Sequence, residues 1–168
     1  MTKLNKLLFL NLFLIILFIG CTPPSALSFF QDDELKANAV QYTQKSDISH
    51  KGEVEAIFNA TYLNSIDEDF DDENQNFIVG IFITRDNTKD KNRFLNNKNF
   101  TLSMNDRNAT YIDELHVQHK MYGHIPIYNN WAKYYVAKFD TNETEESLSI
   151  KLYSKKHKKS AVISFEAE

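Results

Sequence analysis

The chain has 168 residues and a formal net charge of −4, with 19 basic and 23 acidic side chains. This mildly acidic balance provides no general attraction to nucleic acid, and we expect no nucleic-acid partner. The single cysteine excludes an internal disulfide. Only 4 Gly and 3 Pro, together with 13% aromatic residues, indicate a packed core rather than a low-complexity chain.

The chain begins with a short apolar segment that carries positive charge. Lys3 and Lys6 precede a thirteen-residue run, Leu7 to Ile19, which is apolar except for one Asn. As a helix, thirteen residues rise only ~20 Å, which is short of the ~30 Å hydrocarbon core of a membrane. A basic start, a short apolar run and a small residue at its end are typical of a secretory signal peptide, so we predict that residues 1–20 are removed. Removal would change the formal charge from −4 to −6.

The end of this segment carries a recognisable motif. Phe18-Ile19-Gly20-Cys21 resembles a lipobox, where bacterial lipoprotein precursors are acylated on the cysteine and cleaved before it. That family usually has Leu at the position of Phe18, whereas Gly20 and Cys21 fit. The resemblance implies lipidation of Cys21 and a protein held in the bacterial cell envelope by its acyl chains. Because Thr22 rather than Asp follows the cysteine, it also implies the outer membrane, facing the periplasm. An ordinary signal peptide beside an unrelated cysteine is the alternative.

The remaining 148 residues are enough for one domain with a core and leave little room for two. We predict a lipid-anchored tether over residues 21–27, stiffened by two prolines, and a single domain over 28–168. A helix is expected from about Phe29 to Tyr42, because Ser28 and Gln31 fit a capping box at its start.

From residue 54 onward the pattern changes to the period of two that is typical of strands. We predict seven strands, over residues 54–62, 77–83, 100–104, 110–115, 134–139, 148–152 and 161–165. The run 77–83 is almost continuously apolar, which indicates a strand buried on both faces. Gly80 in its middle indicates a bulge or the close approach of another backbone.

The number and spacing of these strands predict the fold class. Seven short strands in about 120 residues, with no helix between successive strands, predict a mainly β protein: an antiparallel β-sandwich with one short N-terminal helix. An immunoglobulin-like topology has the same number of strands, but its Cys…Trp…Cys signature is absent. An up-and-down barrel is the alternative fold.

Three histidines lie within nine residues and form a candidate metal site. His116, His119 and His124 could supply imidazole nitrogens to zinc or copper, with Glu114 as a fourth ligand. The H-E-x-x-H arrangement of zinc enzymes is absent, and a polar loop that contains histidines is the other interpretation.

The connection from Met121 to Trp131 is rich in aromatic residues. Tyr122, Tyr128 and Trp131 are the candidate binding residues, because Tyr and Trp bring a large contact area at little entropic cost. Packing of the same residues over the sandwich is the competing interpretation.

Two further features lie in predicted turns. Four lysines surround His157 in the turn 155–159, which predicts a solvated hairpin tip or a contact with anionic headgroups. Asn108 and Asn142 each lie in an N-x-T pattern with an acidic residue two positions earlier, which resembles the acceptor site of bacterial N-glycosylation. Asn59 and Asn99 have only the short pattern.

Catalytic signatures are missing from the sequence. It contains no G-x-S-x-G elbow and no phosphate-binding glycine loop, so a hydrolase with a carboxylate pair is the least supported class. We therefore expect a protein that is not an enzyme and has no cofactor. The prediction is a lipid-anchored envelope protein that acts as a binding or assembly module, with an envelope protein as its partner. A periplasmic metal-binding protein that uses the three histidines is the alternative.

Overall fold

The computed structural model describes residues 34–66, 70, 73–84, 95, 98–126, 128–140 and 146–166. The predicted signal peptide, Cys21, the tether over 21–27 and Asn142 lie outside these residues, so the expectations for them stay predictions. Within the described residues, no helix is long and apolar enough to cross a membrane.

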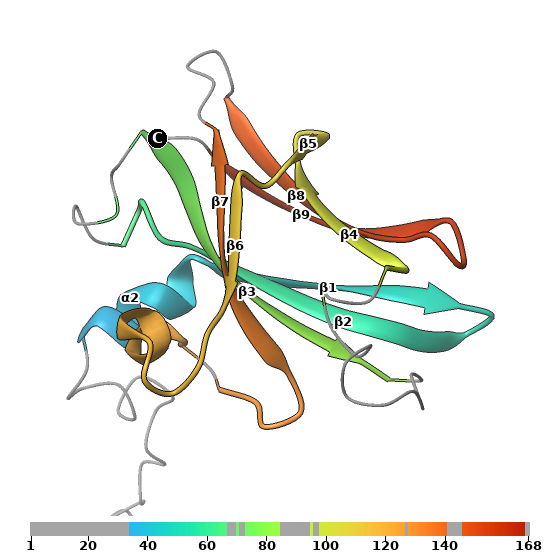
Figure 1. Ribbon diagram of the computed structural model, residues 1–168, viewed down its shortest axis with the longest axis horizontal. Helices are drawn as coiled ribbons and strands as arrows, with labels where there is room; N and C mark the ends of the chain where they lie inside the picture. Colours follow the sequence, from blue (N-terminus) through green and yellow to red (C-terminus); the bar gives the residue numbers. More distant parts are fainter. Residues whose placement is uncertain are drawn as a thin grey trace, which may run out of the picture. The chain divides into compact units, whose positions relative to one another are not determined.

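The described chain folds into two antiparallel sheets, which confirms the predicted β-sandwich (Figure 1). In spatial order, the five-stranded sheet contains β1 (Thr43–His50), β2 (Glu53–Tyr62), β3 (Asn74–Ile83), β7 (Lys133–Asp140) and β6 (Tyr111–Glu114). The four-stranded sheet contains β5 (Arg107–Asn108), β4 (Phe100–Met104), β8 (Ser147–Ser154) and β9 (Lys159–Glu166). The single α-helix among the described residues is α2 (Glu34–Gln41), and a 3₁₀ helix, η4 (Lys120–His124), precedes β7. The part of the predicted helix before residue 34 lies outside the described chain.

The strand order decides between the sandwich topologies. β1, β2 and β3 form a meander within one sheet, whereas the second and third strands of an immunoglobulin fold lie in different sheets. The immunoglobulin-like order is therefore not the one found. The barrel alternative is also wrong, because β1 and β9 lie side by side without a backbone ladder between them. Side chains bridge this seam instead: the Gln44 amide donates to the Ser164 carbonyl over 2.8 Å.

All seven predicted strands are present, and two more were missed. β1 contains a single apolar residue, Ile48, so its sequence lacks the alternation of apolar and polar residues that predicts a strand. It forms because it pairs with β2 along its whole length, from Thr43 opposite Thr61 to His50 opposite Glu53. β5 was missed because it has only two residues.

Between the sheets lies the larger of two apolar clusters. Phe77 stands at its centre, with ring centroids 5.0 Å from Tyr62, 5.6 Å from Phe165 and 6.0 Å from Phe139. All four side chains are almost fully buried, and they come from β2, β3, β7 and β9. The period-two alternation of the sequence therefore packs both sheets against one core.

The outer face of the five-stranded sheet carries the second cluster. Ile78 and Val136 on this face pack with Met121 and Ile125 from the connection that contains η4. This cover explains why β3 is buried on both faces, as its continuous apolar run predicts. Neither a bulge nor the close approach of another backbone explains Gly80, so that prediction was wrong. The ladder around Gly80 is regular, and the groups that approach it are the side chains of Asn59 and Tyr134 rather than another backbone.

Candidate functional site

The outer face of the five-stranded sheet contains a groove of about 410 Å³, which we call the outer-face groove. Its cover consists of Val40 from α2 and of Pro126 and Asn129 from the connection before β7. Its floor comes from four adjacent strands, through Thr43, Lys45, Ile57, Asn59, Thr61, Ile78, Phe82 and Tyr134, with Gln44 also lining it. A volume of this size lies within the range of small-ligand and side-chain pockets.

A single row of residues crosses the sheet at the groove. Lys45 pairs with Asn59, Asn59 with Gly80, and Gly80 with Tyr134, so these four positions share one line across β1, β2, β3 and β7. Gly80 contributes no side chain to this line. A Cβ at Gly80 would overlap Asn59 Oδ1 and lie 2.7 Å from Tyr134 Cε1. The tyrosine ring therefore lies against the glycine position.

The Tyr134 ring is held in place from the cover. The Asn129 backbone N–H donates to the Tyr134 hydroxyl over 2.9 Å, and the ring of Tyr128 stacks on Tyr134 with centroids 5.6 Å apart. Burial raises the pKa of Tyr134, so its hydroxyl stays neutral at physiological pH. The wall of the groove is thus an uncharged aromatic face.

Polar groups on the floor differ in whether they are already engaged. The Thr43 hydroxyl donates to the Ala39 carbonyl and lies 2.7 Å from the Thr61 hydroxyl, so this pair ties α2 to β1 and β2. The exposed Lys45 ammonium and the half-buried Asn59 amide have no such bond within the described chain. They are the polar groups that the groove can offer to a ligand.

The predicted aromatic anchors lie around the groove rather than in it. Tyr122 is half-buried, and its ring centroid lies 5.6 Å from that of Tyr128, whose hydrogen bond raises the pKa of Tyr122. Tyr128 is 52% exposed and Trp131 is 74% exposed. None of the three lines the groove, whereas Tyr134, which the sequence did not single out, forms its aromatic wall.

The predicted histidine ligands have other surroundings. His119 caps η4, with its Nδ1 accepting from the Met121 backbone N–H over 3.1 Å, while His116 is exposed. Glu114 accepts from Lys133 over 2.6 Å, so the proposed fourth ligand is already in an ion pair. Among the residues described, no three His, Cys, Asp or Glu side chains are grouped to hold a metal. The His124 side chain lies outside that part, so the three-histidine site stays a prediction.

The predicted glycosylation residue Asn108 is exposed in β5. The other determinants of its acceptor pattern are engaged in the folded chain: Asp106 pairs with Lys151, and the Thr110 hydroxyl donates to the Lys138 carbonyl. Asn59 lies inside the sheet between two ladders, which excludes it as an acceptor in the folded state.

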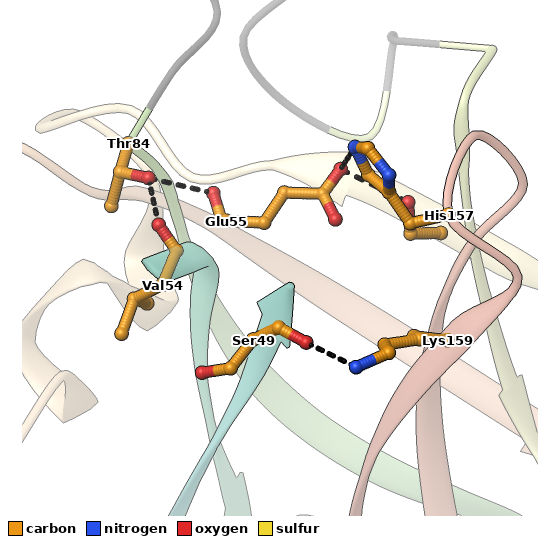
Figure 2. Close-up of polar contacts among 7 residues, drawn as sticks. Ser49, Val54, Glu55, Thr84, His157 and Lys159 are labelled. Atoms are coloured by element: carbon orange, nitrogen blue, oxygen red, sulfur yellow. Dashed lines mark hydrogen bonds and ion pairs between the residues drawn. The ribbon is translucent and has the colours of Figure 1, made fainter. Parts of the chain in front are cut away.

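A second polar cluster joins two hairpins at the far end of β1 (Figure 2). The His157 imidazole lies 3.7 Å from Glu55 Oε1, which also accepts from the buried Ser154 hydroxyl over 3.0 Å. The His50 ring stacks on His157 with centroids 4.2 Å apart. The nearby Lys159 ammonium donates to the Ser49 carbonyl over 2.8 Å. The serine bonds to the glutamate rather than to the histidine, so this is not the arrangement of a serine nucleophile.

Comparison with known proteins gives no relative. No family model matches the chain, and no curated protein and no solved structure matches it. The functional inference therefore rests on the residues of this chain.

Proposed function

We propose that this protein is a lipid-anchored component of the bacterial cell envelope that acts as a non-catalytic binding module. Its proposed anchor is the acylated Cys21, on the strength of the sequence motif at residues 18–21. Its proposed binding site is the outer-face groove. One observation carries this proposal. The Lys45 and Asn59 side chains line the groove beside its aromatic wall, and within the described chain neither makes a hydrogen bond or an ion pair.

The lining of the groove defines the partner it suits. Ile57, Ile78 and Phe82 offer an apolar floor for an apolar side chain. On the same floor, Lys45 can pair with a carboxylate and the Asn59 amide can bond a backbone group. We therefore propose an envelope protein that inserts an apolar side chain next to an acidic residue.

Site-specific photocrosslinking in the native host tests the groove. A photoreactive residue replaces Lys45, which lines the groove, and in a matched strain it replaces Val162, which is 45% exposed on β9 and is not part of the lining. We expect a discrete crosslinked partner from position 45 only. The same crosslink should disappear when Val40→Trp fills the groove, with the unfolding midpoint of that variant measured in parallel. Equal products from both positions, or a product that survives Val40→Trp in a folded protein, would refute the groove as the binding site.

The intact mass of the protein from native membranes tests the anchor. We expect the mass of residues 21–168 plus acyl chains. A mass equal to that of the complete 168-residue chain, or of an unacylated chain, would contradict lipidation of Cys21. Because this experiment does not involve the groove, its failure is distinguishable from failure of the binding proposal.

A further inference from the structure

The second polar cluster brings two basic turns side by side, and we call this region the hairpin tip. It comprises residues 50–52, at the β1–β2 turn, and residues 155–159, at the β8–β9 turn. Two contacts join the turns. The rings of His50 and His157 stack, and Lys159 donates to the Ser49 carbonyl, a bond that Figure 2 shows. Residues more than 100 positions apart in the chain therefore form one surface.

The hairpin tip concentrates positive charge on an otherwise acidic protein. Lys51, Lys155, Lys156 and Lys158 are all exposed, and within the described chain none of these ammonium groups is in an ion pair or a hydrogen bond. Two carboxylates lie on the neighbouring part of β2. Glu53 is exposed, whereas the Glu55 side chain is only 12% exposed and its Oε1 faces His157. The net charge of the exposed tip is therefore positive, opposite in sign to that of the chain.

The fold holds these like charges together. Ser154 and Glu55 fix the base of one hairpin against the other through a bond of 3.0 Å, in a setting where Ser154 is fully buried. Lys51 and Lys158 each take a positive φ angle of 52°, which allows each hairpin to reverse direction within a short turn. Neighbouring like charges repel, and an anionic surface that meets the cluster would relieve this repulsion.

We infer that the hairpin tip is a docking surface for the anionic headgroups of a lipid bilayer. Four exposed ammonium groups spread over two turns suit the distributed charge of a bilayer better than a single phosphate ion, because lysines act as independent point charges. The net charge of the whole chain is negative, so it does not reveal this local attraction to anionic headgroups. The inference does not depend on the groove, and it gives the domain a membrane contact in addition to the proposed acyl anchor.

Amine labelling of the complete chain tests the docking surface. The protein is reconstituted into vesicles of neutral phosphatidylcholine, or of phosphatidylcholine with phosphatidylglycerol. A membrane-impermeant acetylating reagent is then applied, and the labelling rate at each lysine is read by mass spectrometry. We expect at least three-fold slower labelling of Lys51, Lys155, Lys156 and Lys158 in the anionic vesicles, with recovery in high salt. Lys36 on α2 and Lys45 on β1 are internal controls that should change little.

Three outcomes would overturn the inference. Equal labelling rates in both kinds of vesicle would show that the tip is only solvated. Equal slowing at Lys36 and Lys45 would show a general surface effect rather than docking by the tip. Slowing in neutral vesicles on addition of inorganic phosphate alone would show a site for a free anion and not for a bilayer.

A charge variant provides the second measurement. Lys51→Asn and Lys158→Gly keep residues that tolerate positive φ at these turns, and Lys155→Gln and Lys156→Gln remove the other two charges. The chain is held in neutral vesicles, and co-flotation of phosphatidylglycerol vesicles is measured. We expect at least a five-fold loss of vesicle capture. The control Lys36→Gln/Lys98→Gln/Lys138→Gln removes charges elsewhere and should retain capture. An equal loss in both variants would refute a specific role of the tip.

Discussion

The two faces of the five-stranded sheet solve the problem of burial differently. The inner face packs directly against the four-stranded sheet through alternating apolar residues of β2, β3 and β7 and through Ile48 of β1. The outer face is covered by α2 and the connection that contains η4, and it keeps a groove of about 410 Å³ beside the row in which the Asn59 and Tyr134 side chains lie against Gly80. One sheet therefore combines a closed core with an accessible surface.

This difference separates what the fold requires from what is available for binding. The inner face needs complementary packing, because any void there loses both contacts and burial. The outer face combines apolar residues with groups such as Lys45 and Asn59, which add little to a core. We expect stability to depend mainly on the inner face and recognition on the outer face.

The largest expected effect is the loss of the central inner-face ring. Phe77→Ala removes a fully buried ring that contacts three other aromatic rings, so we expect the free energy of unfolding to fall by about 4 kcal/mol. Urea unfolding of the complete chain in a mild detergent, followed by circular dichroism, measures it. Met121→Ala on the outer face should cost only about 2 kcal/mol, because Met121 packs partly against half-buried residues. Equal losses would contradict the division between the faces.

The next effect tests the close packing around Gly80 on the outer face. Gly80→Ala places a methyl group within 2.7 Å of the Tyr134 ring, which is itself bonded to Asn129, so a shift must break packing in the groove. We expect a loss of about 2 kcal/mol in unfolding free energy and loss of crosslinking from position 45. Gly123→Ala is the matched control, since a Cβ there meets nothing within 4 Å. If the two alanines are equally tolerated, Gly80 does not shape the groove.

The fold was predictable where the sequence has a clear period. Strands such as β8 alternate strictly, so their buried residues and their face follow from the pattern. β1 was not predictable in this way, because Ile48 is its only apolar residue and the strand depends on pairing with β2. Tertiary contact overrides local preference at such an edge.

The candidate site was predictable only in part. The aromatic connection before β7 contributes Pro126 and Asn129 to the groove, but Tyr122, Tyr128 and Trp131 do not line it, and their role in binding stays a prediction. The groove depends on the register that aligns Lys45, Asn59 and Gly80, and sequence pattern alone does not fix the register between strands. Gly80 within an apolar run was the available signal, since a missing side chain there lets the Asn59 and Tyr134 side chains approach closely.

A smaller effect tests whether the bond at the base of the hairpin tip stabilises the fold without affecting the groove. Ser154→Ala removes the hydroxyl that donates to Glu55, whose second carboxylate oxygen has no hydrogen-bond partner in the described chain. We expect a loss of about 1.5 kcal/mol in unfolding free energy, since a hydrogen bond to a charged group is lost. Crosslinking through the groove should be retained. The double variant Ser154→Ala/Glu55→Gln should lose less than the sum of the single variants, whereas additive losses would contradict direct coupling.

The smallest effect is a pH dependence confined to the hairpin tip. Burial, followed by the charges of His157, Lys51 and Lys159, lowers the pKa of His50 below its usual value of 6.5, while Glu55 acts in the opposite direction. As the pH falls through 6.5, the unfolded chain therefore takes up a proton that the folded chain resists. The contribution of His50 to stability is present at higher pH, declines from about pH 6.5 downward and is fully lost below the folded pKa.

Substitution of the ring isolates this contribution from general acid effects. His50→Tyr keeps an aromatic partner for His157 but cannot take up the proton, so its unfolding free energy should fall less than that of the natural chain between pH 7.5 and 5.5. Lys51→Asn removes one of the repelling charges and should give an intermediate slope. Identical slopes of unfolding free energy against pH for all three proteins would show that the surrounding lysines do not lower the pKa of His50. The expected slopes would instead show that the positive field of the tip acts on its own residues, which is the field that an anionic bilayer would meet.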